Sequence, residues 1–225
     1  MGGAGPWSPG PPAGSGHATA RELSRQGAAV ALVGRREDRL TELAAEISAE
    51  VGTGLVVPAD LTDPRAAADA VDRTVEGLGR LDTLVDNAGL MLLGPAAVPH
   101  LAKAAADGPR RVAGIVNIGS VAGRVAFGMS AAYCATKFGV GAFSEALRQE
   151  LTGRHVRVSV VEPGSVDTEL RTHNPDAVQE QLNAYLGDIE RLQGQDIADT
   201  VSYIVTRPRH VSIAELLVRP TGQQI

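Results

Sequence analysis

Tyr133 and Lys137 stand four residues apart in the segment YCATK, and this spacing places both side chains on one face of a helix. An ammonium group beside a phenol favours the phenolate, so it lowers the pKa of the phenol from its unperturbed value of about 10. Tyr133 is therefore a candidate proton donor and acceptor near neutral pH. Ser120 lies upstream at the end of the run RVAGIVNIGS, where its hydroxyl could stabilise the oxyanion of a carbonyl that receives hydride.

Each of these residues also has an ordinary structural interpretation. Tyr133 could hold its hydroxyl at the surface, Lys137 could extend its stem along apolar surface, and Ser120 could be a turn residue. Chance pairs with the Tyr-x3-Lys spacing are frequent, so the spacing alone does not decide between a catalytic and a structural role.

Two further places could bind a phosphorylated cofactor. Gly10, Gly14 and Gly16 precede the amphipathic stretch HATARELSRQG, so a glycine turn could bring a pyrophosphate to a helix N-terminus. A Pro- and Gly-rich tail would give the same residues. Arg35 and Arg36 follow the strand-like run AAVALVG, and because arginine can grip a 2′-phosphate bidentately, the pair favours NADP over NAD. Two solvated arginines at the start of a helix are the alternative.

Amphipathic patterns with helical spacing alternate with β-branched runs from Gly14 onward. The patterns predict helices at 17–27, 36–52, 63–79, 96–108, 130–153 and 195–206, and strands at 28–34, 54–60, 81–89, 111–120, 156–164 and 214–220. Such alternation is typical of a parallel sheet with helices on both faces, so the predicted fold class is α/β, doubly wound and Rossmann-like. We expect one domain over residues 1–225, with its ligand at the carboxyl ends of the strands.

Composition excludes several classes of function. The net charge of -5 gives no general attraction to nucleic acid or anionic membranes. We find no secretory signal at the start of the sequence, and no apolar run approaches the ~18 residues of a membrane span. A single cysteine, Cys134, excludes an internal disulfide and indicates a reducing compartment, so we expect a cytoplasmic protein.

Taken in order, the strand-end segments resemble the short-chain dehydrogenase/reductase family. The matching segments are GPPAGSG, GRR, ADLTD, DNAG, NIGSVAG, YCATK and EPGSVDT, and the resemblance runs from residue 10 to the end of the chain. The segments MLLGP, ATKFGVGAFSEALRQE and DTELR are most similar to the clavaldehyde reductase (clavulanate dehydrogenase) branch. The resemblance implies that NADPH reduces an aldehyde or ketone, and it leaves the substrate and the stereochemistry open.

The resemblance also implies a role for each matching residue. Ser120, Tyr133 and Lys137 would be catalytic, with Lys137 also holding the nicotinamide ribose. The residues implied to bind NADP(H) come from every strand end: Gly10, Gly14, Ser15, Gly16, Arg35, Arg36, Asp60, Leu61, Asn87, Ala88, Gly89, Tyr133, Lys137, Pro163, Gly164, Val166 and Thr168. No metal site is implied.

Two regions depart from the family pattern. The family begins with a hydrophobic strand and a Thr-Gly turn, whereas residues 1–9 here read MGGAGPWSP, so we expect an atypical or disordered segment in place of the first strand. Pro11 and Pro12 also lack the N–H groups that such a turn offers to a phosphate. The second region is the interval that holds a long helix in the family; only residues 96–108 remain, and they contain no counterpart of the catalytic Asn that this helix carries.

Loss of a covering helix should expose apolar surface, and we expect the run Leu90–Leu93 to be left partly bare. Family members form dimers or tetramers through this helix and the segment that corresponds to 131–152, so a homodimer or homotetramer should be weakened. Residues 169–194 would form a substrate lid, in which His173 is best interpreted as a solvated loop histidine.

Two functional hypotheses follow. In the first, the protein is an NADPH-dependent carbonyl reductase, which the intact Ser120, Tyr133 and Lys137 favour. In the second, it is a catalytically impaired relative that binds a nucleotide or a partner, or a truncated product without function. The altered first strand, the prolines of the turn and the absent Asn favour the second hypothesis.

Overall fold

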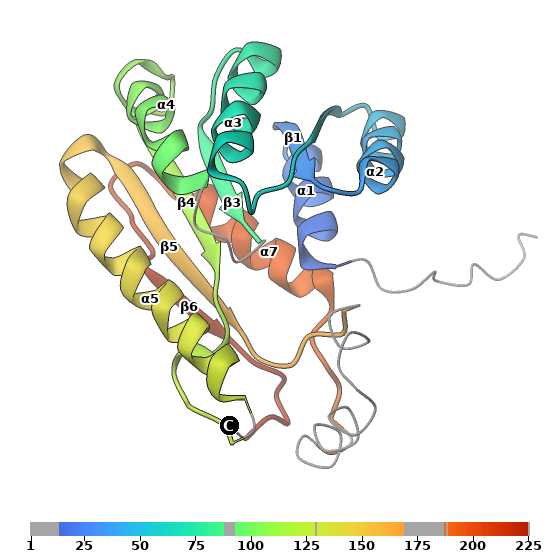
Figure 1. Ribbon diagram of the computed structural model, residues 1–225, viewed down its shortest axis with the longest axis vertical. Helices are drawn as coiled ribbons and strands as arrows, with labels where there is room; N and C mark the ends of the chain where they lie inside the picture. The colour runs from blue at the N-terminus through green and yellow to red at the C-terminus, as the bar shows by residue number, and fades with distance from the viewer. Residues whose placement is uncertain (1–13, 88–92, 129, 169–186, 188, 225) are drawn as a thin grey trace, which may run out of the picture.

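The helices and strands follow the order expected from the sequence. The computed structural model describes residues 14–87, 93–128, 130–168, 187 and 189–224 (Figure 1). The helices are α1 (Ser15–Arg25), α2 (Glu37–Ala49), α3 (Pro64–Leu78), α4 (Leu93–Asp107), η1 (Val121–Gly123), α5 (Ala131–Leu151), η2 (Thr152–Arg154) and α7 (Gly194–Val205). The strands are β1 (Ala29–Gly34), β2 (Thr53–Pro58), β3 (Thr83–Asp86), β4 (Ala113–Ile118), β5 (Val156–Pro163) and β6 (Glu215–Val218).

Local sequence signals set the ends of two helices. Asp63 caps α3, since its carboxylate accepts a hydrogen bond from the Arg65 N–H at 2.9 Å, and Pro64 occupies the first turn. Gly79 ends α3 in the left-handed region at φ 79°, and Gly27 follows α1 at φ 87°. Both glycines confirm the helix ends that the sequence predicts, because the left-handed region favours glycine.

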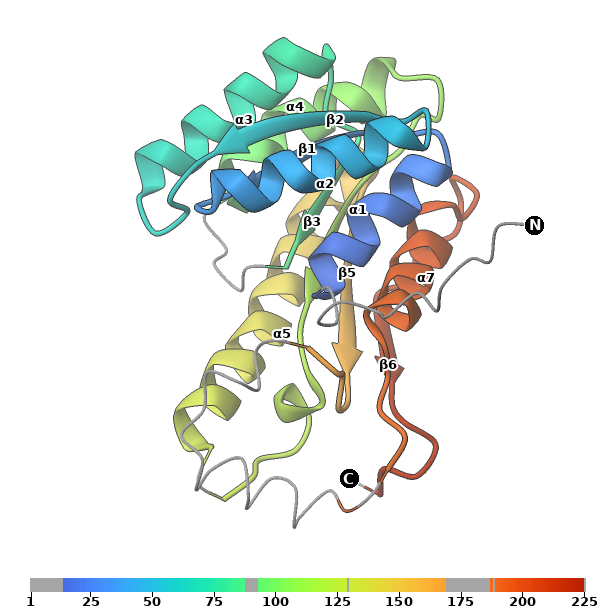
Figure 2. The ribbon, with the colours of Figure 1, turned by 90° about the vertical axis from the view of Figure 1, so that its right-hand side faces the viewer.

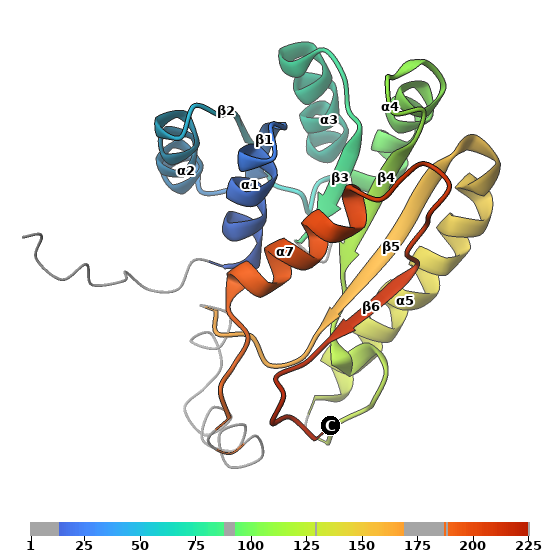
Figure 3. The same cartoon turned by 180° about the vertical axis from the view of Figure 1, so that it is seen from behind.

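The strands are parallel, and β3, β4, β5 and β6 form a sheet in that order. The residues of β4 are all buried, as are nearly all those of β5, because α5 covers one face of this sheet and α7 covers the other (Figures 1 and 3). A parallel sheet between two helical layers is the doubly wound α/β architecture predicted from the sequence.

β1 and β2 form a separate parallel pair, because β1 pairs only with β2 and β3 only with β4 among the described residues. Both β1 and β3 are mostly half-buried, in contrast to β4. Helices join the two parts: α1 packs against α7, and α3 contacts β1, β2 and α4 (Figure 2). The segment expected to replace the first strand, residues 1–9, lies outside the described residues.

The shortened helical interval confirms one expectation and corrects another. α4 is a helix of 15 residues that contains Pro99 and packs against α3. Leu93 is buried in the main core cluster, so the expected exposure of the apolar run is wrong at this residue, and 90–92 lie outside the described residues. The large hydrophobic side chains that are exposed on α5 are Phe138, at 45% exposure, and Tyr133, at 43%. None of the described helices is long and apolar enough to cross a membrane.

Candidate active site

Ser120 lies two residues after the end of β4 and is the N-cap of the short helix η1. Its Oγ accepts a hydrogen bond from the Ala122 N–H at 3.1 Å, and the residue is 8% exposed. The turn is held from two sides: the Gly119 N–H donates to the Val161 carbonyl at 2.7 Å, and a Cβ at Gly123 would lie 2.8 Å from the Lys137 carbonyl oxygen. The position of Ser120 is therefore set by β5 on one side and by α5 on the other.

Tyr133 and Lys137 lie one turn apart near the start of α5, as their spacing predicts. The Lys137 Nζ is 5.8 Å from the centroid of the Tyr133 ring and donates a hydrogen bond to the Ile118 carbonyl at 3.0 Å. Ile118 ends β4 two residues before Ser120. The carboxyl end of β4 and the first turns of α5 thus bring the three candidate catalytic residues to one place.

The environment of Lys137 affects its protonation. Burial lowers the pKa of Lys137, because a charged ammonium loses hydration there, while the nearby Asp86 carboxylate acts in the opposite direction. Asp86 is the last residue of β3 and is 5% exposed. A lysine with a lowered pKa next to a tyrosine is typical of sites that move protons.

The glycine segment and the loop after β3 are in contact. The Ser15 hydroxyl donates a hydrogen bond to the Asn87 side-chain oxygen at 2.8 Å, and a Cβ at Gly16 would lie 2.9 Å from the Asn87 Nδ2. Gly14 is the N-cap of α1, and a Cβ there would meet nothing within 4 Å among the described residues. This open helix N-terminus, with its backbone N–H donors, fits the pyrophosphate of a dinucleotide.

Arg35 and Arg36 are exposed at the carboxyl end of β1, where a 2′-phosphate could meet their guanidinium groups. Hydrogen bonds from the backbone and hydroxyl of Thr62 lower the pKa of Asp60, with a smaller contribution from the charge of Arg35. The Leu61 side chain is buried in the main core cluster, and its contact with the cofactor stays a prediction.

The segment after β5 is tied to the C-terminal residues. The Gly164 N–H donates to the Val218 carbonyl at 2.7 Å, and the Ser165 N–H donates to the Gln223 side chain at 2.8 Å. Pro163 is buried, while Val166 and Thr168 are half-buried, and Val166 bridges to Leu192. This loop lies beyond the carboxyl ends of β5 and β6, where the family resemblance implies a nicotinamide contact.

Several predicted residues fall outside the described part of the chain. Gly10, Ala88, Gly89 and His173 are among them, as is most of the expected lid at 169–194. Asn117 lies among the described residues. Its Nδ2 donates to the buried Ser144 hydroxyl at 2.7 Å and so joins β4 to α5. This structural role supports the interpretation that Asn117 does not replace the missing catalytic Asn.

Sequence reasoning missed a charged cluster beside the turn that carries Ser120. The Arg124 Nε lies 2.8 Å from both carboxylate oxygens of Glu162, and the same guanidinium contacts Glu215 on β6. Glu162 is 4% exposed. The only signal in the sequence was Glu162, a carboxylate near the end of a mostly apolar strand, which indicates a buried partner.

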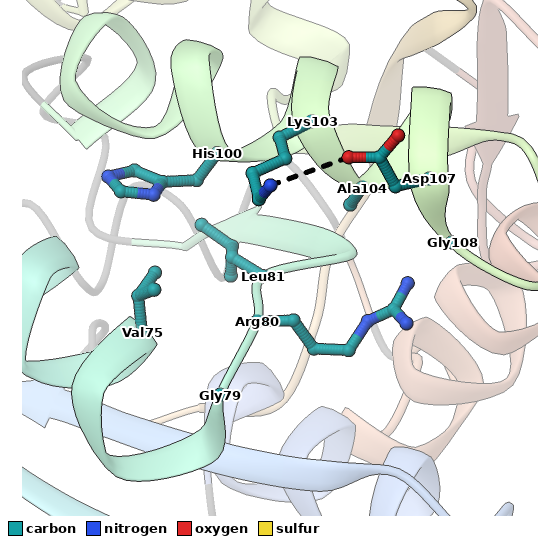
Figure 4. Close-up of a pocket in the computed structure, with 9 residues that line it drawn as sticks. All are labelled: Val75, Gly79, Arg80, Leu81, His100, Lys103, Ala104, Asp107 and Gly108. Atoms are coloured by element: carbon teal, nitrogen blue, oxygen red, sulfur yellow. Dashed lines mark hydrogen bonds and ion pairs between the residues drawn. The ribbon is translucent and has the colours of Figure 1, made fainter.

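A cavity of about 220 Å³ lies between α3 and α4, at the opposite end of the sheet from Ser120 (Figure 4). The basic side chains that line it already have acidic partners: Lys103 lies 3.4 Å from Asp107, His100 lies 3.5 Å from Asp72, and the Arg80 Nε donates to Asp82 at 2.6 Å. Both flanking helices end here, and helix C-termini repel anions. The cavity therefore does not fit a phosphorylated cofactor.

Fold and site together define a dinucleotide-dependent oxidoreductase with a serine, a tyrosine and a lysine at the carboxyl end of a parallel sheet. The family model for short chain dehydrogenases matches residues 10–107 and 96–179 of this chain. The protein belongs to the short-chain dehydrogenase/reductase family and is an oxidoreductase of that family.

Individual relatives span nearly the whole chain. Sulfoacetaldehyde reductase 2 of Chromohalobacter salexigens is 35% identical over 93% of this chain and 91% of its own length. An uncharacterized oxidoreductase of Mycobacterium tuberculosis is also 35% identical, over 93% and 88%. A short chain dehydrogenase of Burkholderia cenocepacia in complex with NADP superposes with a TM-score of 0.76, at 28% identity and 93% coverage of both chains.

Proposed function

We propose that the protein is an NADP(H)-dependent carbonyl reductase that converts an aldehyde or ketone to an alcohol. The observation that carries the proposal is the arrangement of Ser120, Tyr133 and Lys137 around the carboxyl end of β4, with the Lys137 Nζ 5.8 Å from the Tyr133 ring. When bound, NADPH would supply the hydride to the carbonyl carbon.

The side chains would divide the remaining work. The Tyr133 phenol donates its proton to the carbonyl oxygen, and the Ser120 hydroxyl donates a hydrogen bond that holds this oxygen in place. The Ser120 oxygen accepts a hydrogen bond from the Ala122 N–H, so the hydroxyl proton remains available. Ser120 can therefore donate to the carbonyl oxygen without losing the hydrogen bond from Ala122. Lys137 places a positive charge beside Tyr133, which stabilises the negative charge left after proton transfer.

The cofactor site follows from the same arrangement. The N-terminus of α1 at Gly14, Ser15 and Gly16 would bind the pyrophosphate, and Asn87 would line the cleft beside it. Arg35 and Arg36 would bind the 2′-phosphate, which favours NADPH over NADH. The remaining contacts are assigned to residues after β2, β3 and β5: Asp60, the backbone of Leu61, Ala88, Gly89, Pro163, Gly164, Val166 and Thr168.

A small aldehyde is the substrate class that we propose first. The similarity to sulfoacetaldehyde reductase 2 supports an aldehyde, and the segments MLLGP and DTELR support the clavaldehyde reductase branch. We place the protein in the cytoplasm, because a single cysteine fits a reducing compartment. We assign residues 1–225 to one domain. The exposed Phe138 of α5 supports self-association as a homodimer or homotetramer, which the shortened helical interval would weaken.

Oxidation of NADPH in the presence of a panel of aldehydes and ketones tests the proposal, with sulfoacetaldehyde in the panel. We expect turnover of at least one aldehyde, and its loss in the Tyr133→Phe variant. A folded protein that binds NADPH without turnover would favour the second candidate function, a nucleotide-binding relative. The absence of a counterpart of the family's catalytic Asn from residues 96–108 is the observation that favours this second candidate.

A further inference from the structure

Arg124 connects three parts of the chain that meet at the candidate active site. It follows η1, four residues after Ser120, and its guanidinium reaches the penultimate residue of β5 and the first residue of β6. The Arg124 Nε is 2.8 Å from each oxygen of Glu162 on β5, and a second nitrogen is 2.8 Å from one of them. The guanidinium also contacts Glu215 on β6, in a pair that is exposed to solvent on both sides.

The two carboxylates differ in how much they depend on this arginine. The Glu162 side chain is 6% exposed, while that of Glu215 is 50% exposed. A buried carboxylate without a cation is strongly destabilising, whereas an exposed ion pair contributes little. The hydrogen bond with Glu162 also raises the pKa of Arg124, which therefore stays charged.

A displacement of the Glu162 side chain would disturb two neighbouring segments of the candidate site. It immediately precedes Pro163 and Gly164, and its Cγ would lie 3.3 Å from a Cβ added at Gly119, the residue before Ser120. The ion pair thus lies between the turn that carries Ser120 and the loop assigned to the nicotinamide.

We propose that Arg124 is a positioning residue, which fixes the Ser120 turn against the Pro163–Gly164 loop through Glu162. This inference rests on the proposed reductase function, in which Ser120 must meet the carbonyl oxygen while that loop borders the nicotinamide. Arg124 lies four residues after Ser120 in the sequence, and it acts on Ser120 only through the turn.

The test compares three single variants and one double variant. Arg124→Ala removes the clamp, Arg124→Lys keeps the charge but loses the bidentate geometry, and Glu215→Gln is the matched control that removes only the exposed contact. The double variant Arg124→Ala with Glu162→Gln is included because it leaves no unpaired buried carboxylate if the single variant fails to fold.

Three quantities are measured on each folded variant. They are the rate of amide hydrogen exchange over 119–125, kcat for aldehyde reduction and the Kd for NADPH. In Arg124→Ala, or in the double variant, we expect exchange to accelerate and kcat to fall about tenfold or more, since small misplacements of reacting groups are costly. We expect an intermediate effect in Arg124→Lys, no change in Glu215→Gln, and a nearly constant Kd throughout.

Unchanged exchange over 119–125, or a kcat within about twofold of the wild type, would overturn the positioning role. A wild-type protein without turnover would reject the proposed function instead. In that case the exchange measurement still decides whether Arg124 holds the turn.

Discussion

The part of the molecule built on β3–β6 and the part built on β1 and β2 are supported differently. β4 and β5 lie inside a continuous parallel sheet between α5 and α7, and their residues are buried nearly throughout. Among the described residues, β1 and β2 are a two-stranded pair, which helix contacts join to the rest. Because Ser120, Tyr133 and Lys137 belong to the first part, the proposed catalytic groups have the firmer support among the described strands. The proposed cofactor contacts are divided between both parts.

The largest effect is expected in the firmly supported part. Tyr133→Phe removes the proposed proton donor and should lower kcat by about 10³-fold, within the range of general acid catalysis. The Kd for NADPH should stay nearly constant, because the phenyl ring keeps the shape of the site. Steady-state kinetics and a cofactor titration of the same preparation measure both quantities. Substantial turnover by Tyr133→Phe would remove this residue from its assigned role.

The second-largest effect, a loss of affinity for NADPH, is expected in the part built on β1 and β2. Arg35→Ala with Arg36→Ala should weaken NADPH binding about 10- to 100-fold, because each charge-assisted hydrogen bond contributes roughly 1.5–3 kcal/mol and 1.4 kcal/mol corresponds to a tenfold change. NADH binding should change much less, since NADH has no 2′-phosphate. Parallel titrations with the two cofactors make the comparison, and equal losses for both would contradict the assignment of the arginines.

A smaller effect is expected where the two parts meet. Gly16→Ala would place a Cβ 2.9 Å from the Asn87 Nδ2, and the Ser15 hydroxyl restrains the same side chain. We expect the Kd for NADPH to rise about tenfold, in line with the 1–3 kcal/mol of overpacking. Gly153→Ala is the matched control, because a Cβ there would meet nothing within 4 Å. If both variants bind NADPH like the wild type, the α1 N-terminus is not where the cofactor lies.

The smallest effect is the contribution of Lys137 to the pH dependence of the free energy of unfolding. Its pKa is lowered in the folded state, mainly by burial, so the unfolded chain binds more protons between the folded pKa and the unfolded value of about 10.4. The free energy of unfolding should therefore rise with pH across that window, and Lys137→Met should lack this rise. The difference in unfolding free energy between the two proteins, measured by denaturation at several pH values, isolates the contribution. A difference that falls with pH would contradict the lowered pKa.

Much of the fold could be predicted because its signals are local. Gly27 and Gly79 end helices through their own backbone conformation, and the four-residue spacing of Tyr133 and Lys137 survives in any helix. The Arg124–Glu162 pair could not be predicted, since its members are 38 residues apart and meet only after β5 has paired with β4. Leu93 was misjudged for the same reason, because α4 buries it in a core that the sequence alone does not reveal.

We propose that the two parts of the molecule together form an NADPH site beside a working catalytic group. A fluorescence titration of the folded protein with NADPH, and in parallel with NADH, tests this proposal. We expect saturable binding with a clear preference for NADPH. A well-folded protein that binds neither cofactor would contradict it, and would show that the glycine segment before α1 no longer serves a dinucleotide.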